Sequence, residues 1–148
     1  MSMVKISKTY SFDAAHQLVG HKGKCANLHG HTYTVKVWVK GELLGPVYPS
    51  SKGMIIDYDD LDNIVKPIID QMDHSFLSDH TEPIWQAVSD DSDAFGKTYY
   101  VGDRTTAENL AHDIWMSLRF HWPLNIKLVG VIVSETPKTS AEYIGEVN

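Results

Sequence analysis

Residues 31–42, HTYTVKVWVKGE, alternate apolar and polar side chains. Such alternation is typical of a strand with one buried face, because successive side chains of a strand point to opposite sides. The apolar side would carry Tyr33, Val35, Val37 and Val39. Residues 4–16 show the same period at Val4, Ile6, Tyr10 and Phe12. The chain is therefore predicted to begin with two neighbouring antiparallel strands.

The period changes from residue 59 onward. Apolar side chains then recur three and four residues apart, as on one face of a helix, at Leu61, Ile64, Val65, Ile68, Ile69 and Met72. Pro67 falls inside this pattern and is expected to kink or split the helix. A second helix is expected where a capping box, Thr105 to Glu108, precedes an apolar stripe at Leu110, Ala111, Ile114, Trp115 and Leu118.

Residues 127–135 and 140–147 are predicted to form two further strands. Residues 78–103 are irregular and acid-rich, and a connection of that length is expected to be a functional or mobile loop. The order of two strands, two helices and two strands predicts an α+β fold, with a four-stranded antiparallel sheet and both helices on one face. The length of 148 residues fits one domain, spanning residues 1–148.

Composition excludes several classes of protein. The formal net charge is −6 and the basic residues are scattered, so binding to nucleic acid is not expected. No apolar run approaches the length of a membrane span, and no signal peptide is recognised. A single cysteine can form neither an internal disulfide nor a Cys-rich zinc site. We therefore expect a cytoplasmic protein.

Histidine is abundant, with eight residues, and three of them have a suggestive pattern. His29 and His31 lie two residues apart on a predicted strand, so their side chains share a side. His16 has the same parity as Tyr10 and Phe12 of the preceding strand. Three imidazoles would thus meet at the end of the buried face. Zinc accepts three neutral imidazoles and keeps a fourth position open, whereas buried histidines without a metal remain the alternative.

Four other residues have both a chemical and a structural interpretation. Cys25 is a small buried hydrophobe by default, or a low-pKa thiolate beside a cation. His74 either interacts with a helix C-terminus or is oriented by Asp73 for proton transfer. Glu135 ends a strand with the parity of Val129, Val131 and Val133. A carboxylate on a core face needs either a salt bridge or a ligand with a guanidine-like N–H edge.

Taken together, these residues bring a family resemblance into view. The chain resembles the 6-pyruvoyl tetrahydropterin synthase/6-carboxytetrahydropterin synthase family over nearly its whole length, through the ordered segments FDAAH, CANLHGHTY, GMIIDYDDL, MDHSFL, TAENLA and SETP. The spacing from Cys25 to His31 is similar to that of the branch that makes the carboxy product in the queuosine pathway. The pyruvoyl branch usually has a longer gap between cysteine and histidine.

The resemblance implies a role for each candidate residue. The zinc ligands would be His16, His29 and His31. The catalytic residues would be Cys25, Asp73 and His74, with the thiolate as general base and the Asp–His pair as the second proton-transfer unit. The pterin would be bound by Glu135, Thr106 and Glu108. For Glu108 the capping box remains a structural alternative.

The resemblance also implies an assembly and a reaction. Family members adopt the tunnelling fold, in which trimers pool their sheets into a barrel and usually stack into hexamers with active sites at subunit boundaries. The substrate would be 7,8-dihydroneopterin triphosphate, converted to 6-carboxy-5,6,7,8-tetrahydropterin, acetaldehyde and triphosphate. The alternatives are a pyruvoyl-forming or aldolase-like reaction, or a non-catalytic zinc- or pterin-binding module. Metal binding alone requires none of Cys25, Asp73, His74 and Glu135, which argues against the module.

Overall fold

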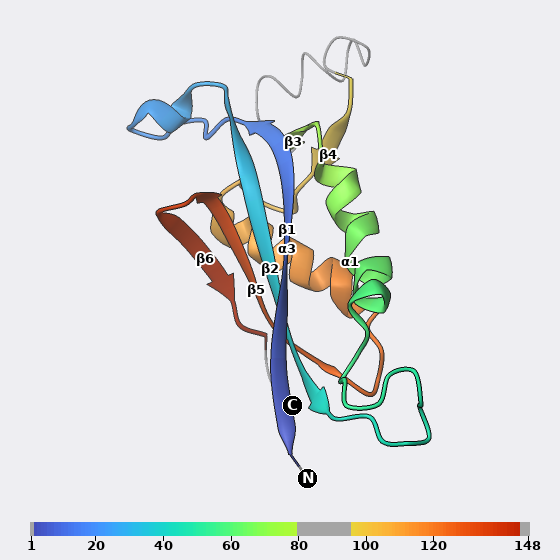
Figure 1. Cartoon of the computed structure of the whole chain (residues 1–148). Coiled ribbons are helices and arrows are strands. Elements are labelled where there is room, and N and C mark those ends of the chain that lie inside the picture. The colour runs from blue at the N-terminus through green and yellow to red at the C-terminus, as the bar shows by residue number, and fades with distance from the viewer. Residues whose placement is uncertain (1, 80–95, 146–148) are drawn as a thin grey trace.

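A long two-stranded hairpin forms the centre of a six-stranded sheet with the order β4-β3-β1-β2-β5-β6 (Figure 1). The computed structural model describes residues 2–79 and 96–145. The strands are β1 (Met3–His16), β2 (His29–Glu42), β3 (Ser75–Ser78), β4 (Thr98–Tyr100), β5 (Lys127–Thr136) and β6 (Thr139–Tyr143). The helices are α1 (Tyr58–Met72), α3 (Ala107–Arg119) and the 3-10 helix η1 (Lys24–Ala26).

The two predicted N-terminal strands are confirmed as β1 and β2. They pair antiparallel without a register shift, from Met3 opposite Glu42 to His16 opposite His29. The core residues on this hairpin are Tyr10, Phe12, Tyr33, Val35, Val37 and Val39. Because the side-chain period of a strand is two, an unshifted ladder keeps the same face buried up to the end of the hairpin.

The predicted third and fourth strands are β5 and β6, and both pair antiparallel as expected. Between Trp38 and Val39 of β2 the register shifts, leaving Val129 as an extra residue on β5. The face predicted to include Val129 is therefore interrupted there, and Leu128 packs against the core instead. Beyond the shift the predicted parity of Glu135 holds.

The sheet is wider than predicted. β3 pairs parallel with β1, and β4 pairs parallel with β3, so the prediction of a four-stranded, purely antiparallel sheet is wrong. Both strands are short, and β3 is buried throughout, so neither shows a detectable alternation. Residues 98–100, predicted to be irregular within 78–103, thus form a strand. Residues 80–95 of that predicted loop lie outside the described residues.

The predicted first helix is confirmed as α1, which is not split at Pro67. Asp57 caps its start, because the carboxylate accepts the Asp59 N–H at 2.9 Å. Pro67 lacks the N–H that would bond to the carbonyl of Asn63. Both residues are exposed, so water can take the place of the missing bond.

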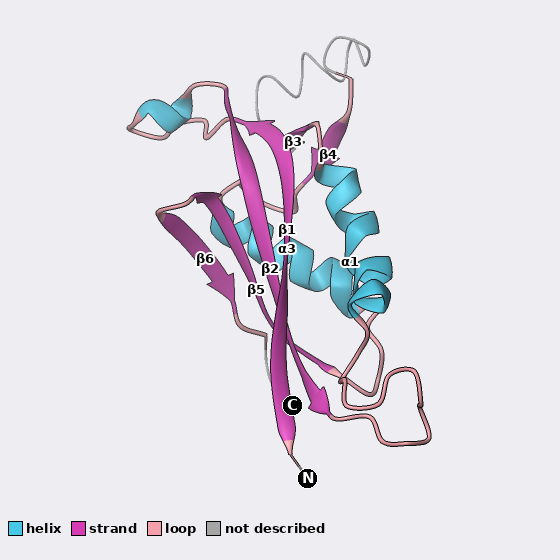
Figure 2. Cartoon of the chain, viewed as in Figure 1, coloured by secondary structure: helices cyan, strands magenta, loops and turns pink. Residues whose placement is uncertain are grey.

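Both helices lie on the same face of the sheet, as predicted (Figure 2). α1 contacts β1 and β3, α3 contacts β5 and β6, and the two helices contact each other. Their buried faces close the core over the hairpin, with Leu61, Val65 and Met72 from α1 and Leu110, Ile114 and Leu118 from α3. Within the described residues, neither helix combines the length and apolarity needed to cross a membrane.

Candidate metal centre and active site

Three imidazoles meet at the end of the β1–β2 hairpin, on the side of the core. His16 and His29 are the last opposite pair of the ladder, and His31 lies two residues further along β2. The ring centroids are 4.6 Å apart for His16–His29, 4.8 Å for His29–His31 and 5.2 Å for His16–His31. One ring nitrogen of each residue lies within 4.8 Å of the others. The unshifted ladder therefore brings the three predicted histidines together.

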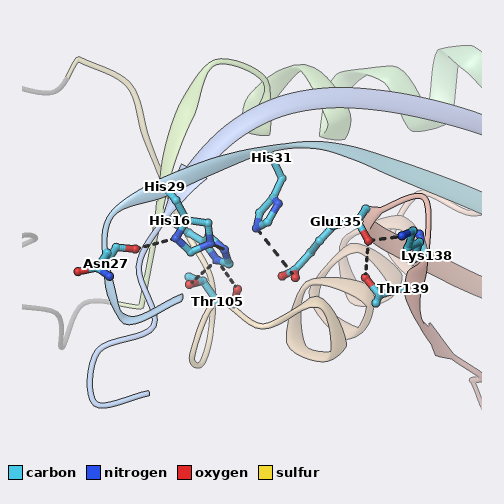
Figure 3. A network of polar contacts seen from close by, with 9 residues as sticks. His16, Asn27, His29, His31, Thr105, Glu135, Lys138 and Thr139 are labelled. Carbon is cyan, nitrogen blue, oxygen red and sulfur yellow. Dashed lines mark hydrogen bonds and ion pairs between the residues drawn. The ribbon is translucent and has the colours of Figure 1, made fainter. Parts of the chain in front are cut away.

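Backbone carbonyls set the tautomer of two of these rings (Figure 3). His16 Nδ1–H donates to the Thr105 carbonyl at 2.8 Å, and His29 Nδ1–H donates to the Asn27 carbonyl at 2.6 Å. A neutral imidazole carries only one N–H, so both Nε2 atoms present lone pairs. These Nε2 atoms lie 3.0 Å apart. At that distance the lone pairs repel each other unless a proton or a metal cation lies between them.

Burial disfavours a proton in this position. Burial, together with the charges of His29 and His31, lowers the pKa of His16 from 6.5 to about 4, against the opposing hydrogen bond to Thr105. Burial and His29 also lower the pKa of His31. The Nε2 atom of His31 is buried and has no hydrogen-bond partner among the described residues. The three imidazoles can turn ring nitrogens toward one point and so fit a metal cation, and the buried Nε2 atom of His31 would be left unsatisfied without one.

Glu135 projects from the end of β5 toward the histidines (Figure 3). Its Oε2 atom lies 4.0 Å from His31 Nε2, which is longer than a hydrogen bond, so the carboxylate keeps its capacity to accept N–H groups. Burial raises the pKa of Glu135, the nearby Glu108 raises it further, and His29 lowers it. The carboxylate therefore lies on the core side of β5, as its parity predicts, and faces the imidazoles.

The start of α3 differs by one residue from the predicted capping box. Thr106 is the cap, and its Oγ1 atom accepts the Asn109 N–H at 3.3 Å. The predicted box required Thr105 as the cap and Glu108 as the third helical residue, whereas Glu108 is the second. The structural interpretation of Glu108 is therefore wrong. Its exposed carboxylate is instead close enough to affect the pKa of Glu135.

Cys25 lies on η1, in the connection between β1 and β2. It is half-buried, not packed in the core as the default interpretation of a lone cysteine predicts. A hollow at this place is lined by Lys24, Cys25, His29 and His31. The Leu18 N–H donates to the Cys25 carbonyl at 2.9 Å and fixes the connection. The residue that carries the thiol thus borders the same space as two of the imidazoles.

Asp73 and His74 follow the end of α1. His74 Nδ1 lies 2.9 Å from Asp73 Oδ2, and the other Asp73 oxygen accepts the Asp13 N–H at 2.9 Å. The Asp13 N–H and His74 lower the pKa of Asp73. His74 has a left-handed backbone with φ of 54°, and its N–H donates to the Asp13 carbonyl at 2.6 Å. The backbone of β1 therefore orients the pair, which favours the proton-transfer interpretation over a helix-end interaction.

The Asp73–His74 pair lies beside the Asp13 carboxylate and not among the imidazoles, although one open hollow is lined by both His31 and His74. The Asp13 carboxylate, which has an oxygen within 4.8 Å of both residues of the pair, accepts the Thr32 hydroxyl at 2.5 Å. Asp13 and Thr32 are exposed and, by strand alternation, point away from the face that carries the three imidazoles. One chain thus presents its candidate groups on two opposite sides of the same hairpin.

Several residues that shape the site were missed from the sequence. Asn27 and Thr105 act through backbone carbonyls, which any residue can supply, so no sequence signal marks them. Lys97 donates from its Nζ atom to the carbonyl of Asp73 at 2.9 Å, from a position next to β4. Tyr33 was recognised only as a core residue of β2, although its hydroxyl is buried near the cluster. The parity that it shares with His31 is part of the sequence prediction, but parity gives no sign that its hydroxyl lacks a partner among the described residues.

Two curated relatives match almost the whole chain. The 6-carboxy-5,6,7,8-tetrahydropterin synthase of Haemophilus influenzae is 45% identical over 145 residues, which cover 95% of this chain and 99% of the relative. The enzyme of the same name from Aquifex aeolicus is 31% identical over 161 aligned positions, covering 94% and 96% of the two chains.

Solved structures and a family model agree with this relationship. The 6-pyruvoyl tetrahydropterin synthase of Caenorhabditis elegans superposes with a TM-score of 0.71 at 28% identity, covering 99% of this chain and 98% of that one. An uncharacterized protein from Wolinella succinogenes has the same fold, with a TM-score of 0.82 at 22% identity and coverage of 99% and 100%. The model of the family described as 6-pyruvoyl tetrahydropterin synthase matches residues 5–146. With its three converging imidazoles and these relatives, the chain belongs to the 6-pyruvoyl tetrahydropterin synthase family.

Proposed function

We propose that this protein is a 6-carboxy-5,6,7,8-tetrahydropterin synthase. It would convert 7,8-dihydroneopterin triphosphate to 6-carboxy-5,6,7,8-tetrahydropterin, acetaldehyde and triphosphate, as a lyase of queuosine biosynthesis. The observation that carries the proposal is the cluster of three imidazoles beside Cys25 and Glu135, since a metal, a thiol and a carboxylate are the groups that such a cleavage needs. The relationship to the Haemophilus influenzae enzyme supports the choice of product.

The metal is proposed to be zinc, held by His16, His29 and His31. Zinc prefers a small set of nitrogen and sulfur ligands, and three imidazoles leave one position for substrate oxygen. When bound, zinc supplies Lewis acidity that makes a coordinated hydroxyl easier to deprotonate. The chain prepares the ligands, because the carbonyls of Thr105 and Asn27 hold the Nδ1 protons of His16 and His29 and so aim the Nε2 lone pairs inward.

Glu135 is proposed to anchor the pterin. A carboxylate accepts two parallel N–H groups, and the pterin edge offers its 2-amino group and a neighbouring ring N–H. Burial of Glu135 strengthens such bonds, because they form in a medium of low effective dielectric constant. Thr106 and Glu108 at the start of α3 would line the same pocket, which agrees with the effect of Glu108 on the pKa of Glu135.

Cys25 is proposed to be the general base that removes a proton from the substrate side chain. A bound metal cation nearby would lower the thiol pKa and favour the thiolate. His74, oriented by the carboxylate of Asp73 at 2.9 Å, would move the second proton. The positive charge of Lys24, beside Cys25 in the same hollow, makes it a candidate for contact with the triphosphate.

The active site is proposed to form between copies of the chain, in a trimer or hexamer. Within one chain the Asp73–His74 pair lies beside Asp13, whose side chain points away from the imidazoles, so a second copy is proposed to bring its own pair to the imidazole side. The short strands β4 and β6 form the two sheet edges within the described residues, and joining them between copies would close a barrel of the tunnelling fold.

Mass spectrometry of the reaction products tests the proposal. The metal-loaded protein is incubated with 7,8-dihydroneopterin triphosphate, and the pterin and the small carbonyl product are identified. A 6-carboxy pterin together with acetaldehyde is expected. A pyruvoyl product, or cleavage of 7,8-dihydroneopterin as by an aldolase, would refute the product assignment but keep the site. No turnover by protein with a full complement of metal would instead favour a non-catalytic binding module.

A further inference from the structure

Tyr33 carries a buried hydroxyl beside the candidate site. It lies two residues beyond His31 on the same face of β2, and its side chain is 0% exposed. The hydroxyl makes no hydrogen bond within the described residues. A buried polar group without a partner is destabilising, and a phenylalanine of nearly the same shape would avoid the penalty. The partner of this hydroxyl is therefore expected to appear in another state of the protein.

Neighbouring rings hold the Tyr33 side chain in place. It stacks on Phe12 with ring centroids 4.9 Å apart and an interplanar angle of 10°. Its ring also lies nearly perpendicular to those of His31 and His16, with ring centroids 5.4 Å and 6.0 Å away. A ring fixed on several sides cannot swing to find a distant acceptor. Its hydrogen-bond partner must come from groups that already lie close.

Glu135 is such a group. Thr34 of β2 pairs with Ser134 of β5, and the next step of this antiparallel register places Tyr33 opposite Glu135. Side chains directly opposite each other on one face are neighbours, with Cβ atoms about 4.5–5.5 Å apart. A phenol hydroxyl is a hydrogen-bond donor, and a carboxylate oxygen on the neighbouring strand is a suitable acceptor for it.

We propose that Tyr33 is a positioning residue that donates a hydrogen bond to Glu135 when ligand is bound. Glu135 Oε2 lies 4.0 Å from His31 Nε2, beyond hydrogen-bond distance, so the imidazole takes up none of the lone pairs of the carboxylate. A ligand that turns the carboxylate toward its own N–H groups would let Glu135 accept the Tyr33 O–H with one remaining lone pair. Its remaining lone pairs then face the two N–H groups of a guanidine-like ligand edge. This inference rests on the proposed function, because it takes the pterin as that ligand.

A pair of matched variants tests the proposal. Tyr33→Phe removes only the hydroxyl and keeps the stacked ring. Tyr10→Phe is the control, since Tyr10 lies on the same face but its hydroxyl already donates to Asp62 at 2.9 Å. Binding of neopterin to the metal-loaded proteins is followed by pterin fluorescence, and metal content is measured by elemental analysis. We expect about tenfold weaker neopterin binding in Tyr33→Phe, with unchanged metal content. Tyr10→Phe should lower stability but leave neopterin affinity unchanged.

A double-mutant cycle shows whether Tyr33 acts through Glu135. In the Glu135→Gln background, Tyr33→Phe should weaken neopterin binding far less than in the wild-type protein. A merely structural role of the hydroxyl would give the same loss in both backgrounds and would overturn the inference. Wild-type affinity in Tyr33→Phe, or loss of its metal, would overturn it as well. Failure of the wild-type protein to bind neopterin would overturn the proposed function together with this inference.

Discussion

Acidification should destabilise the metal-free protein, because His16 is buried in its neutral form. Burial lowers the pKa of His16 from 6.5 to about 4, so between these values the unfolded chain binds a proton that the folded chain does not. The free energy of unfolding therefore falls as the pH drops through this window. Above pH 6.5 His16 is neutral in both states and does not reduce the free energy of unfolding. Between pH 6.5 and 4 the reduction grows as the unfolded chain takes up the proton.

The magnitude follows from the width of the window. Each unit of pKa difference corresponds to about 1.4 kcal/mol, so His16 alone should cost about 2 kcal/mol between pH 6.5 and 5. His31 acts in the same direction, because its pKa is also lowered. Glu135 has the opposite effect on the free energy of unfolding. Because its pKa is raised, the folded state binds a proton at a higher pH than the unfolded state does, which stabilises the folded state on acidification. Asp73 has a pKa below the ordinary value of 3.8, so its protonation affects stability only at more acidic pH than this window.

Urea denaturation of the chelator-treated protein at pH 7, 6 and 5, followed by circular dichroism, measures this effect. His16→Gln removes the titrating group and should flatten the dependence of unfolding free energy on pH. His21→Gln is the control, since His21 is exposed in the β1–β2 connection and its replacement should leave the slope unchanged. Saturating zinc should move the loss of stability to lower pH, because metal and protons compete for the same lone pairs. A wild-type slope no steeper than that of His16→Gln would refute the reasoning.

Three other substitutions test single groups. Cys25→Ala should abolish turnover with wild-type metal content by elemental analysis, and loss of metal would instead make the thiol a ligand. Glu135→Gln should weaken neopterin binding at least tenfold by fluorescence, because it replaces a charge-assisted acceptor pair, and unchanged affinity would contradict the anchor role. Thr106→Ala should lower the free energy of unfolding by about 1 kcal/mol in urea, with Thr106→Ser close to wild type, because the hydroxyl caps α3. Equal stability of the two Thr106 variants would argue against the cap.

The histidine cluster could be predicted because the rule behind it is local. Parity along a strand depends only on the absence of a bulge, and the β1–β2 ladder has none from Met3 to His16. The same rule failed at Val129, where a register shift with β2 changes the face, and nothing in the valine-rich segment marks that shift. The predicted cap of α3 was one residue too early, because Thr105 and Thr106 are equally good caps by residue type.

Other features depend on contacts between distant parts of the chain. β3 and β4 are too short to show a period, and they form by pairing with strands far away in sequence. The side of the hairpin on which Asp73 and His74 lie is set by the Asp13 backbone, more than fifty residues earlier. Neither the parity of a strand nor the stripe of a helix carries that information.

The position of Cys25 outside the strands has a consequence for how such enzymes can change. The three imidazoles are fixed by a ladder of paired strands, whereas the thiol is carried by η1 in the connection that ends at His29. Adding or removing residues in that connection would move the thiol relative to the substrate without disturbing the pairing that holds the ligands. Under the proposed role of Cys25, insertions and deletions in this one connection would change where the thiol meets the substrate, while the paired strands stay under constraint.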